Sequence, residues 1–109
     1  MISYDDFAKL QIVLGKILSV EAVPDADKLL RIMVDVGEET PRQIVSGIRT
    51  FFEDPQVLVG KTCPFLTNLE YRTIRGFESQ GMILAAGTGE NDFSLLEASN
   101  PLPPGSKVK

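Results

Sequence analysis

The segment at residues 29–36 alternates apolar and mixed side chains more regularly than any other part of the chain. Leu30, Ile32 and Val34 share one side of this alternation, and Arg31 projects to the opposite side. Successive side chains of a β-strand point to opposite faces, so a period of two predicts a strand with one buried and one mixed face. The glycine and proline at 37–41 predict a turn, after which the chain returns as the second strand of a hairpin.

Turn signals divide the rest of the chain into equally short elements. A helix is expected at 4–10, where Asp5 and Asp6 favour the positive N-terminal end. Gly15 lies inside a long extended run and is typical of a bulge or bend. Further strands are expected at 11–22, 42–48, 61–69 and 82–86, and one or two helical turns at 54–58. This pattern predicts an all-β fold with short helices, a five-stranded barrel of the oligonucleotide/oligosaccharide-binding (OB) type.

The chain of 109 residues is expected to form one domain, since no linker or repeat interrupts it. We expect an N-terminal helix at 1–10, the barrel at 11–86 and a C-terminal extension at 87–109. No apolar run approaches the roughly 20 residues of a membrane helix, so no membrane partner is expected. The single cysteine, Cys63, cannot form an internal disulfide, and this favours the reducing cytoplasm.

The residues available for chemistry are few. The chain has no histidine and one cysteine, which excludes a histidine-based catalytic arrangement, an imidazole metal site and a structural zinc site. No combination of nucleophile, base and oxyanion donor is recognisable. We therefore expect a binding module that is not an enzyme and holds no cofactor or metal.

A polar segment between two glycines is the strongest indication of a binding site. Gly76 and Gly81 can adopt positive φ or allow another backbone to approach, so the segment between them is expected to be tight and exposed. Arg72 and Arg75 precede it, and residues 82–86 predict a short buried strand. A hydroxyl, an amide and a thioether beside two arginines favour contact with a polar, anionic partner.

Short sequence blocks spread over nearly the whole chain carry a family resemblance. They are Tyr4-Asp5-Asp6-Phe7-Ala8-Lys9-Leu10, Gly15-Lys16-Ile17, Pro24-Asp25-Ala26-Asp27-Lys28-Leu29, Val34-Asp35-Val36-Gly37, Ile44-Val45-Ser46-Gly47-Ile48, Arg75-Gly76 with Glu78-Ser79-Gln80-Gly81-Met82, and Pro104-Gly105-Ser106-Lys107-Val108. In this order the blocks resemble the tRNA-binding oligonucleotide-fold domain, which occurs at the C-terminus of methionyl-tRNA synthetases and as small dimeric tRNA-binding proteins. The resemblance implies an OB barrel whose N-terminal helix and C-terminal segment pack at a two-fold dimer interface.

The resemblance also implies the function. It implies a homodimeric accessory module that binds tRNA by shape and not by sequence, either alone or as part of a methionyl-tRNA synthetase. The candidate tRNA-binding residues are Lys28, Arg31, Arg42, Ser46, Arg72, Arg75, Ser79 and Met82. Each has a structural alternative: a solvated surface charge for the basic residues, a turn-stabilising hydroxyl for the serines, and a core position for Met82.

The charge of the chain supports a second hypothesis. The net charge is −4, and Val13, Glu70 and Thr73 stand where family members often carry basic residues. Because phosphate neutralisation supplies most non-specific RNA affinity, these changes weaken the expectation of RNA binding. The alternative is a dimerisation or protein-interaction module, in one form chaperone-like, with little RNA affinity.

Overall fold

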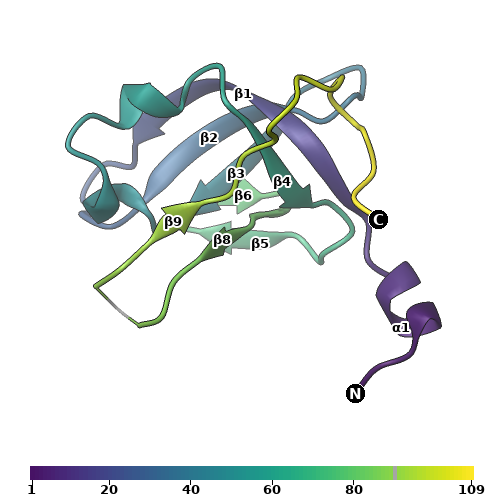
Figure 1. Ribbon diagram of the computed structural model, residues 1–109. Helices are drawn as coiled ribbons and strands as arrows, with labels where there is room; N and C mark the ends of the chain where they lie inside the picture. The colour runs from purple at the N-terminus through teal and green to yellow at the C-terminus, as the bar shows by residue number, and fades with distance from the viewer. Residues whose placement is uncertain (90) are drawn as a thin grey trace.

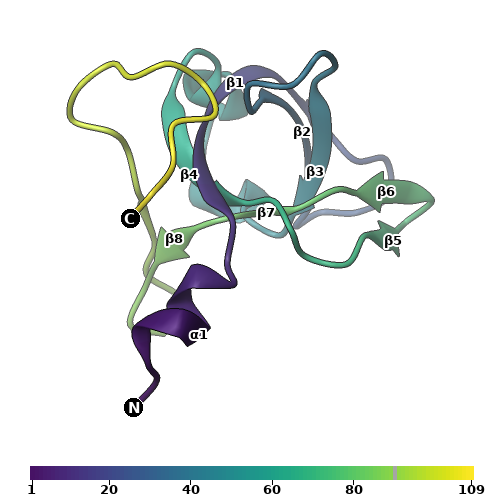
Figure 2. The ribbon, with the colours of Figure 1, turned by 90° about the vertical axis from the view of Figure 1, so that its right-hand side faces the viewer.

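The computed structural model, which describes residues 1–89 and 91–109, is built around one curled antiparallel sheet (Figure 1). Its strand order is β3-β2-β1-β4-β7. The strands are β1 (Ile12–Ala22), β2 (Leu30–Asp35), β3 (Arg42–Ser46), β4 (Thr62–Leu66) and β7 (Met82–Ile83). Seen end-on, the sheet curves round into a nearly closed barrel (Figure 2). The predicted all-β, five-stranded barrel is confirmed; residue 90 of the expected extension lies outside the described residues.

Smaller elements surround the barrel. They are the helix α1 (Tyr4–Ala8), the 3-10 turns η1 (Arg49–Phe51) and η2 (Pro55–Leu58), the hairpin of β5 (Arg72–Ile74) and β6 (Phe77–Ser79), and the hairpin of β8 (Ala85–Ala86) and β9 (Ser94–Leu95). The Asp54 carboxylate accepts the backbone N–H of Gln56 and so caps η2, as expected for an aspartate before a proline. Among the described residues no helix is long and apolar enough to cross a membrane.

Strand β1 changes partner along its length. It pairs with β4 over residues 12–16 and with β2 over residues 16–22. A bulge or bend was expected at Gly15, and the register irregularity lies after it, between Ile17 and Ser19. Gly15 is needed for packing instead, because a Cβ there would lie 2.7 Å from Val34 Cγ2 and 2.8 Å from Phe65 Cδ2.

The alternation in β2 places its apolar side in the core, as predicted. Leu30, Ile32 and Val34 are fully buried, together with Phe65 of β4. A second, smaller cluster contains Val23, Ala26 and Val45, with Leu29, Ile74 and Phe77 packed against it. The β5–β6 hairpin therefore folds over the outer side of β3 (Figure 2).

The polar segment after β6 closes the barrel against β3. The Gln80 backbone N–H donates to the Gln43 carbonyl at 2.7 Å, and the Gln43 N–H donates to the Gln80 side-chain oxygen at 3.0 Å. The Ser79 hydroxyl accepts the Val45 N–H at 3.0 Å. These bonds replace the missing strand pairing between the two edges of the sheet.

The strand expected at 82–86 is not a single buried strand. Within it Ile83 is the buried residue, while Met82, Ala85 and Ala86 are exposed. The prediction was wrong because the chain pairs with β4 only at Met82 and Ile83 and then leaves to pair with β9. An apolar run of this length carries no signal for such a change of partner.

The C-terminal segment binds to β1 of the same chain. The Leu14 N–H donates to the Ser106 carbonyl at 2.8 Å, and the Gly105 N–H donates to the Leu14 carbonyl at 2.7 Å. Helix α1 differs: a capping box at Ser3 and Asp6 starts it, but it buries no residue and stands away from the barrel (Figures 1 and 2).

We expect Cys63 to be inert in the folded protein. Its side chain is fully buried, and burial raises the pKa of the thiol to about 11. Because the thiolate is the reactive form, a disulfide reagent at pH 8 should label no thiol in the native state and one per chain in urea. Fast labelling without denaturant would contradict this packing.

Candidate nucleic-acid interface

A cleft of about 230 Å³ opens where the β5–β6 hairpin meets the ends of β3 and β7. It is lined by Leu29, Val45, Ser46, Gly47, Leu69, Glu70, Arg72, Ile74, Ser79, Gly81 and Met82. Four of the predicted site residues therefore meet here from separate elements: Ser46, Arg72, Ser79 and Met82. The face formed by the second and third strands is the usual ligand face of an OB barrel.

A second hollow adjoins this cleft and shares Leu29 with it. Lys28 and Arg75 line it, beside the loop carboxylates Asp25 and Asp27. Lys28, Arg72 and Arg75 are all exposed, and none of them belongs to the ion pairs found among the described residues. Three free cations thus flank one apolar cleft.

The β5–β6 turn presents Arg75. Ile74 pairs with Phe77, so Arg75 and Gly76 form a two-residue loop in which both have positive φ, 51° and 83°. Positive φ at both positions defines a type I′ turn, which matches the twist of a hairpin and favours Asn-Gly. Arginine is unusual in this conformation, which costs a residue with a Cβ about 1 kcal/mol or more.

The side chain of Arg31 is fixed by contacts with neighbouring side chains. Its Nε donates to the Gln43 side-chain oxygen at 2.6 Å, and Nη1 forms an ion pair with Glu21 at 3.2 Å. The guanidinium also lies over the Phe77 ring, 5.5 Å from its centre. These contacts fix the β5–β6 hairpin to the outer side of β2 and β3 and leave Arg31 partly exposed.

Arg42 is more completely engaged. It forms a two-point ion pair with Glu38, and its Nη1 donates to the Thr67 carbonyl at 2.6 Å and the Gln80 carbonyl at 2.9 Å. This ion pair lowers the pKa of Glu38 and raises that of Arg42. With Tyr71 against its guanidinium, Arg42 holds three segments of the barrel together.

Ser79 is 5% exposed, although its segment was expected to be exposed. Its hydroxyl accepts the Val45 N–H and donates to the Gly81 carbonyl at 3.2 Å. The structure thus shows a barrel-closing hydroxyl at this position, whereas Met82, for which a core position was the alternative, is 43% exposed beside it.

Ser79→Ala should lower the free energy of unfolding by about 1–3 kcal/mol, because it leaves the buried Val45 N–H without a partner. Ser46→Ala, at the rim of the same cleft, is the control and should stay within about 0.5 kcal/mol. Urea denaturation of both variants measures the difference. Equal stability of the two variants would show that the Ser79 hydroxyl does not close the barrel.

The three positions at which the resemblance implies basic residues are spread over the molecule. Val13 bridges to Lys107 and packs against the main core, away from the cleft. Glu70 lines the cleft, and Thr73 is exposed in β5. Leu29 and Leu69, whose apolar side chains also line the cleft, were not predicted as site residues, because each lies at the end of an expected strand.

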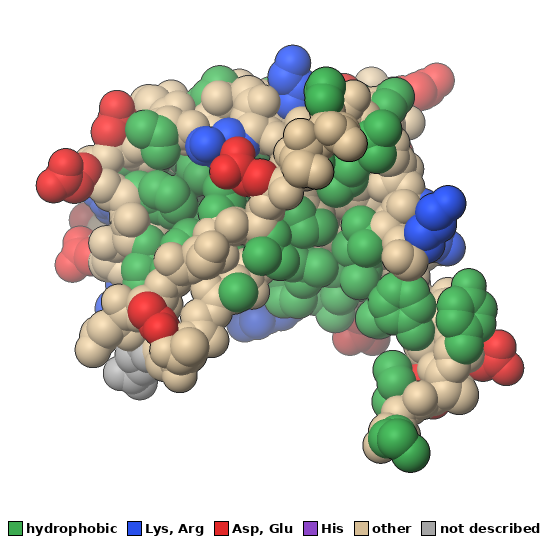
Figure 3. All heavy atoms as spheres, viewed as in Figure 1, with side chains coloured by type: hydrophobic (Ala, Val, Ile, Leu, Met, Phe, Trp, Pro, Cys, Tyr) green, Lys and Arg blue, Asp and Glu red, His purple; other side chains and the backbone are tan. Residues whose placement is uncertain are grey.

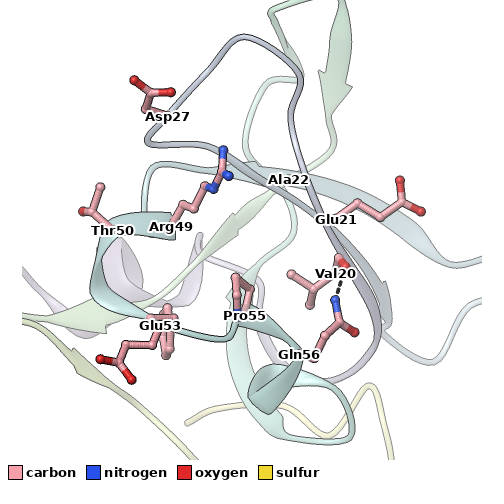
Figure 4. Close-up of a pocket in the computed structure, with 10 residues that line it drawn as sticks. Val20, Glu21, Ala22, Asp27, Arg49, Thr50, Glu53, Pro55 and Gln56 are labelled. Carbon is pink, nitrogen blue, oxygen red and sulfur yellow. Dashed lines mark hydrogen bonds between the residues drawn. The ribbon is translucent and has the colours of Figure 1, made fainter.

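A larger hollow, about 560 Å³, lies elsewhere, between β1 and the two 3-10 turns (Figure 4). Arg49 is its single basic lining residue, against the carboxylates of Glu21, Asp27 and Glu53. This charge balance does not suit a polyanion. In the described part of the chain no cluster of three potential metal ligands is present.

An OB barrel with exposed cations around an apolar cleft defines a class of nucleic-acid-binding domain. The family model described as "Putative tRNA binding domain" matches residues 12–107. The chain belongs to this family, in agreement with the resemblance seen in the sequence.

Relatives and solved structures agree with this assignment. The chain is 50% identical to a methionine–tRNA ligase of Methanoregula boonei and 49% identical to one of Myxococcus xanthus, covering 100% and 99% of this chain but only 16% and 15% of those proteins. The structure of a MetRS related protein from Pyrococcus horikoshii has a TM-score of 0.93 at 33% identity. The match covers 100% of this chain and 98% of that protein's chain. The structure of chaperone CsaA from Bacillus anthracis has a TM-score of 0.87 at 27% identity, with 100% and 99% coverage.

Proposed function

We propose that this domain binds folded tRNA through the face that carries the cleft, without reading its sequence. The observation that carries the proposal is the placement of three exposed cations, Lys28, Arg72 and Arg75, around one apolar cleft in a domain of this family. Contacts to phosphates position RNA but carry no sequence information, so cations on a rigid barrel select shape.

The residues divide into two groups in this proposal. The exposed cations contact phosphates, whereas Arg31, Arg42 and Ser79 hold the hairpin and the barrel edge in place through the bonds described above. The matched relatives are named methionine–tRNA ligase, and the chain spans about one sixth of their length. We propose that the module serves such a ligase, in the cytoplasm, as an attached domain or a separate partner.

The first test compares folded tRNA with an unstructured RNA of equal length in a titration at about 0.1 M salt. We expect tighter binding of the folded tRNA and weaker binding of both RNAs as salt rises. Equal affinity for the two RNAs would contradict the proposed selection by shape. No binding even at low salt would contradict the proposed RNA-binding function.

We further propose that the domain is a homodimer in which α1 is part of the interface. Tyr4 is 77% exposed and Ile2 is 71% exposed, and α1 buries nothing within the chain. Hydrophobic side chains also gather on the barrel face beside α1 (Figure 3). A second copy that covers these surfaces would bury apolar area that one chain leaves in water.

Sedimentation should give twice the chain mass of 12.0 kDa for the unmodified protein and the chain mass for an Ile2→Asp/Tyr4→Asp variant. Aspartate is favourable at Tyr4 in the first turn of α1, and Ile2 precedes the N-cap Ser3, so the variant removes apolar side chains without removing α1. Val57→Asp/Val59→Asp, which adds the same two negative charges at other exposed apolar side chains, should remain dimeric. A monomeric unmodified protein would contradict the dimer.

A chaperone-like interaction module is the second candidate. It is favoured by the net charge of −4 and by the fold similarity to a protein named chaperone CsaA. This candidate predicts that the domain suppresses aggregation of an unfolded protein and that folded tRNA does not compete. If tRNA relieves the suppression of aggregation, tRNA and the unfolded protein bind the same face.

A further inference from the structure

The lining of the cleft is largely apolar and in contact with solvent. Leu69 is 41% exposed and Met82 is 43% exposed, and the apolar lining also includes Leu29, Val45 and Ile74. The volume, about 230 Å³, lies below the roughly 300–1,000 Å³ of pockets that enclose drug-sized ligands. A cleft of this size and lining suits one small, flat, apolar-faced group.

The cations around the cleft indicate that this group is part of an anionic chain. Arg72 lines the cleft itself, and Lys28 and Arg75 line the hollow that shares Leu29 with it. Glu70 lines the cleft as well and disfavours a phosphate inside it. The cleft therefore accepts an uncharged group, while the exposed Arg72 and the two cations of the adjoining hollow accept the anionic chain that carries this group.

We propose that the cleft takes one unstacked base of the bound RNA, with the neighbouring phosphates at Arg72 and at the Lys28–Arg75 hollow. The proposal rests on the proposed function and adds the part of the RNA that is recognised. Unpaired bases in loops and at ends can be splayed out and packed on side chains, whereas bases inside a duplex cannot. The domain thus favours RNA whose surface offers an unpaired base.

The chain lacks tryptophan, so a single introduced tryptophan reports on the cleft without background. Leu69→Trp places an indole on the cleft wall, where a base would stack on it. Val59→Trp is the matched control, since Val59 is 42% exposed and does not line the cleft. Bound tRNA should lower the emission of the Leu69→Trp protein about twofold or more and leave that of the control unchanged, whereas a fully paired RNA duplex should change neither.

Met82→Ala provides the second variant and needs no aromatic insertion. It should weaken tRNA binding about tenfold by removing the floor under the base, while Val59→Ala should bind like the unmodified protein. If tRNA binds but neither cleft variant responds, the base-binding inference is wrong and the proposed function stands. If the unmodified protein binds no tRNA, both are wrong. Quenching by an unfolded polypeptide and not by RNA would assign the cleft to a protein ligand and overturn the inference.

Discussion

Removing Lys28, Arg72 and Arg75 together should weaken tRNA binding at low salt by about 100-fold or more. Each phosphate contact adds nearly one to the slope of log affinity against log salt, so the slope should fall by about two to three. The variant is Lys28→Ala/Arg72→Ala/Arg75→Asn. Asparagine is chosen at the turn because Asn-Gly is the favoured pair for the type I′ conformation that Arg75 and Gly76 adopt.

The control for this variant carries the same charge change at a different place. Lys16→Ala/Lys107→Ala/Lys109→Ala removes three exposed cations that line neither the cleft nor the adjoining hollow. Titrations of both variants at two salt concentrations separate a local contact from a general effect of net charge. Equal losses in the two variants would show that the binding face lies elsewhere or that the attraction is not localised.

Phe65→Ala should have the largest effect on stability. Phe65 is fully buried at the centre of the barrel, where its ring lies against the space that Gly15 leaves open. Loss of a buried phenylalanine costs about 3–5 kcal/mol, a large part of the 5–15 kcal/mol typical of a small domain. Urea denaturation measures the change, which should appear in the midpoint with a nearly constant slope.

Two further variants serve as controls for Phe65→Ala. Phe65→Leu keeps most of the apolar volume and should recover much of the loss. Val59→Ala, at a half-exposed position, should change stability by less than about 0.5 kcal/mol. A loss below about 1 kcal/mol for Phe65→Ala would show that this ring is not the centre of the core.

The main barrel could be predicted because its information is local. The alternation at Leu30, Ile32 and Val34 directly reports one buried face, and the turn after it fixes the hairpin with β3. The β5–β6 hairpin was not predicted, since strands of three residues carry too little pattern. Its type I′ turn was not predicted either. Asparagine or glycine is typical of the positive-φ position that Arg75 occupies, and arginine gives no such indication.

The candidate site could be predicted in part. Arg72, Ser46 and Met82 do meet at one cleft, as their positions around a barrel suggested. The burial of Ser79 depends on Val45, which lies 34 residues away, and the engagement of Arg42 depends on carbonyls 25 and 38 residues away. Such long-range bonds exist only after the barrel has closed, so local sequence patterns could not reveal them.

The proposed function and the base-binding inference both require that tRNA binds the face around the cleft. Amide chemical shifts of the isotope-labelled protein, recorded as folded tRNA is added, test it most directly. We expect changes at residues 28–29, 46–47, 69–76 and 79–82, and none at 16–18 or 57–60. Changes centred on η2 or on the hollow around Arg49, with the cleft unaffected, would contradict it.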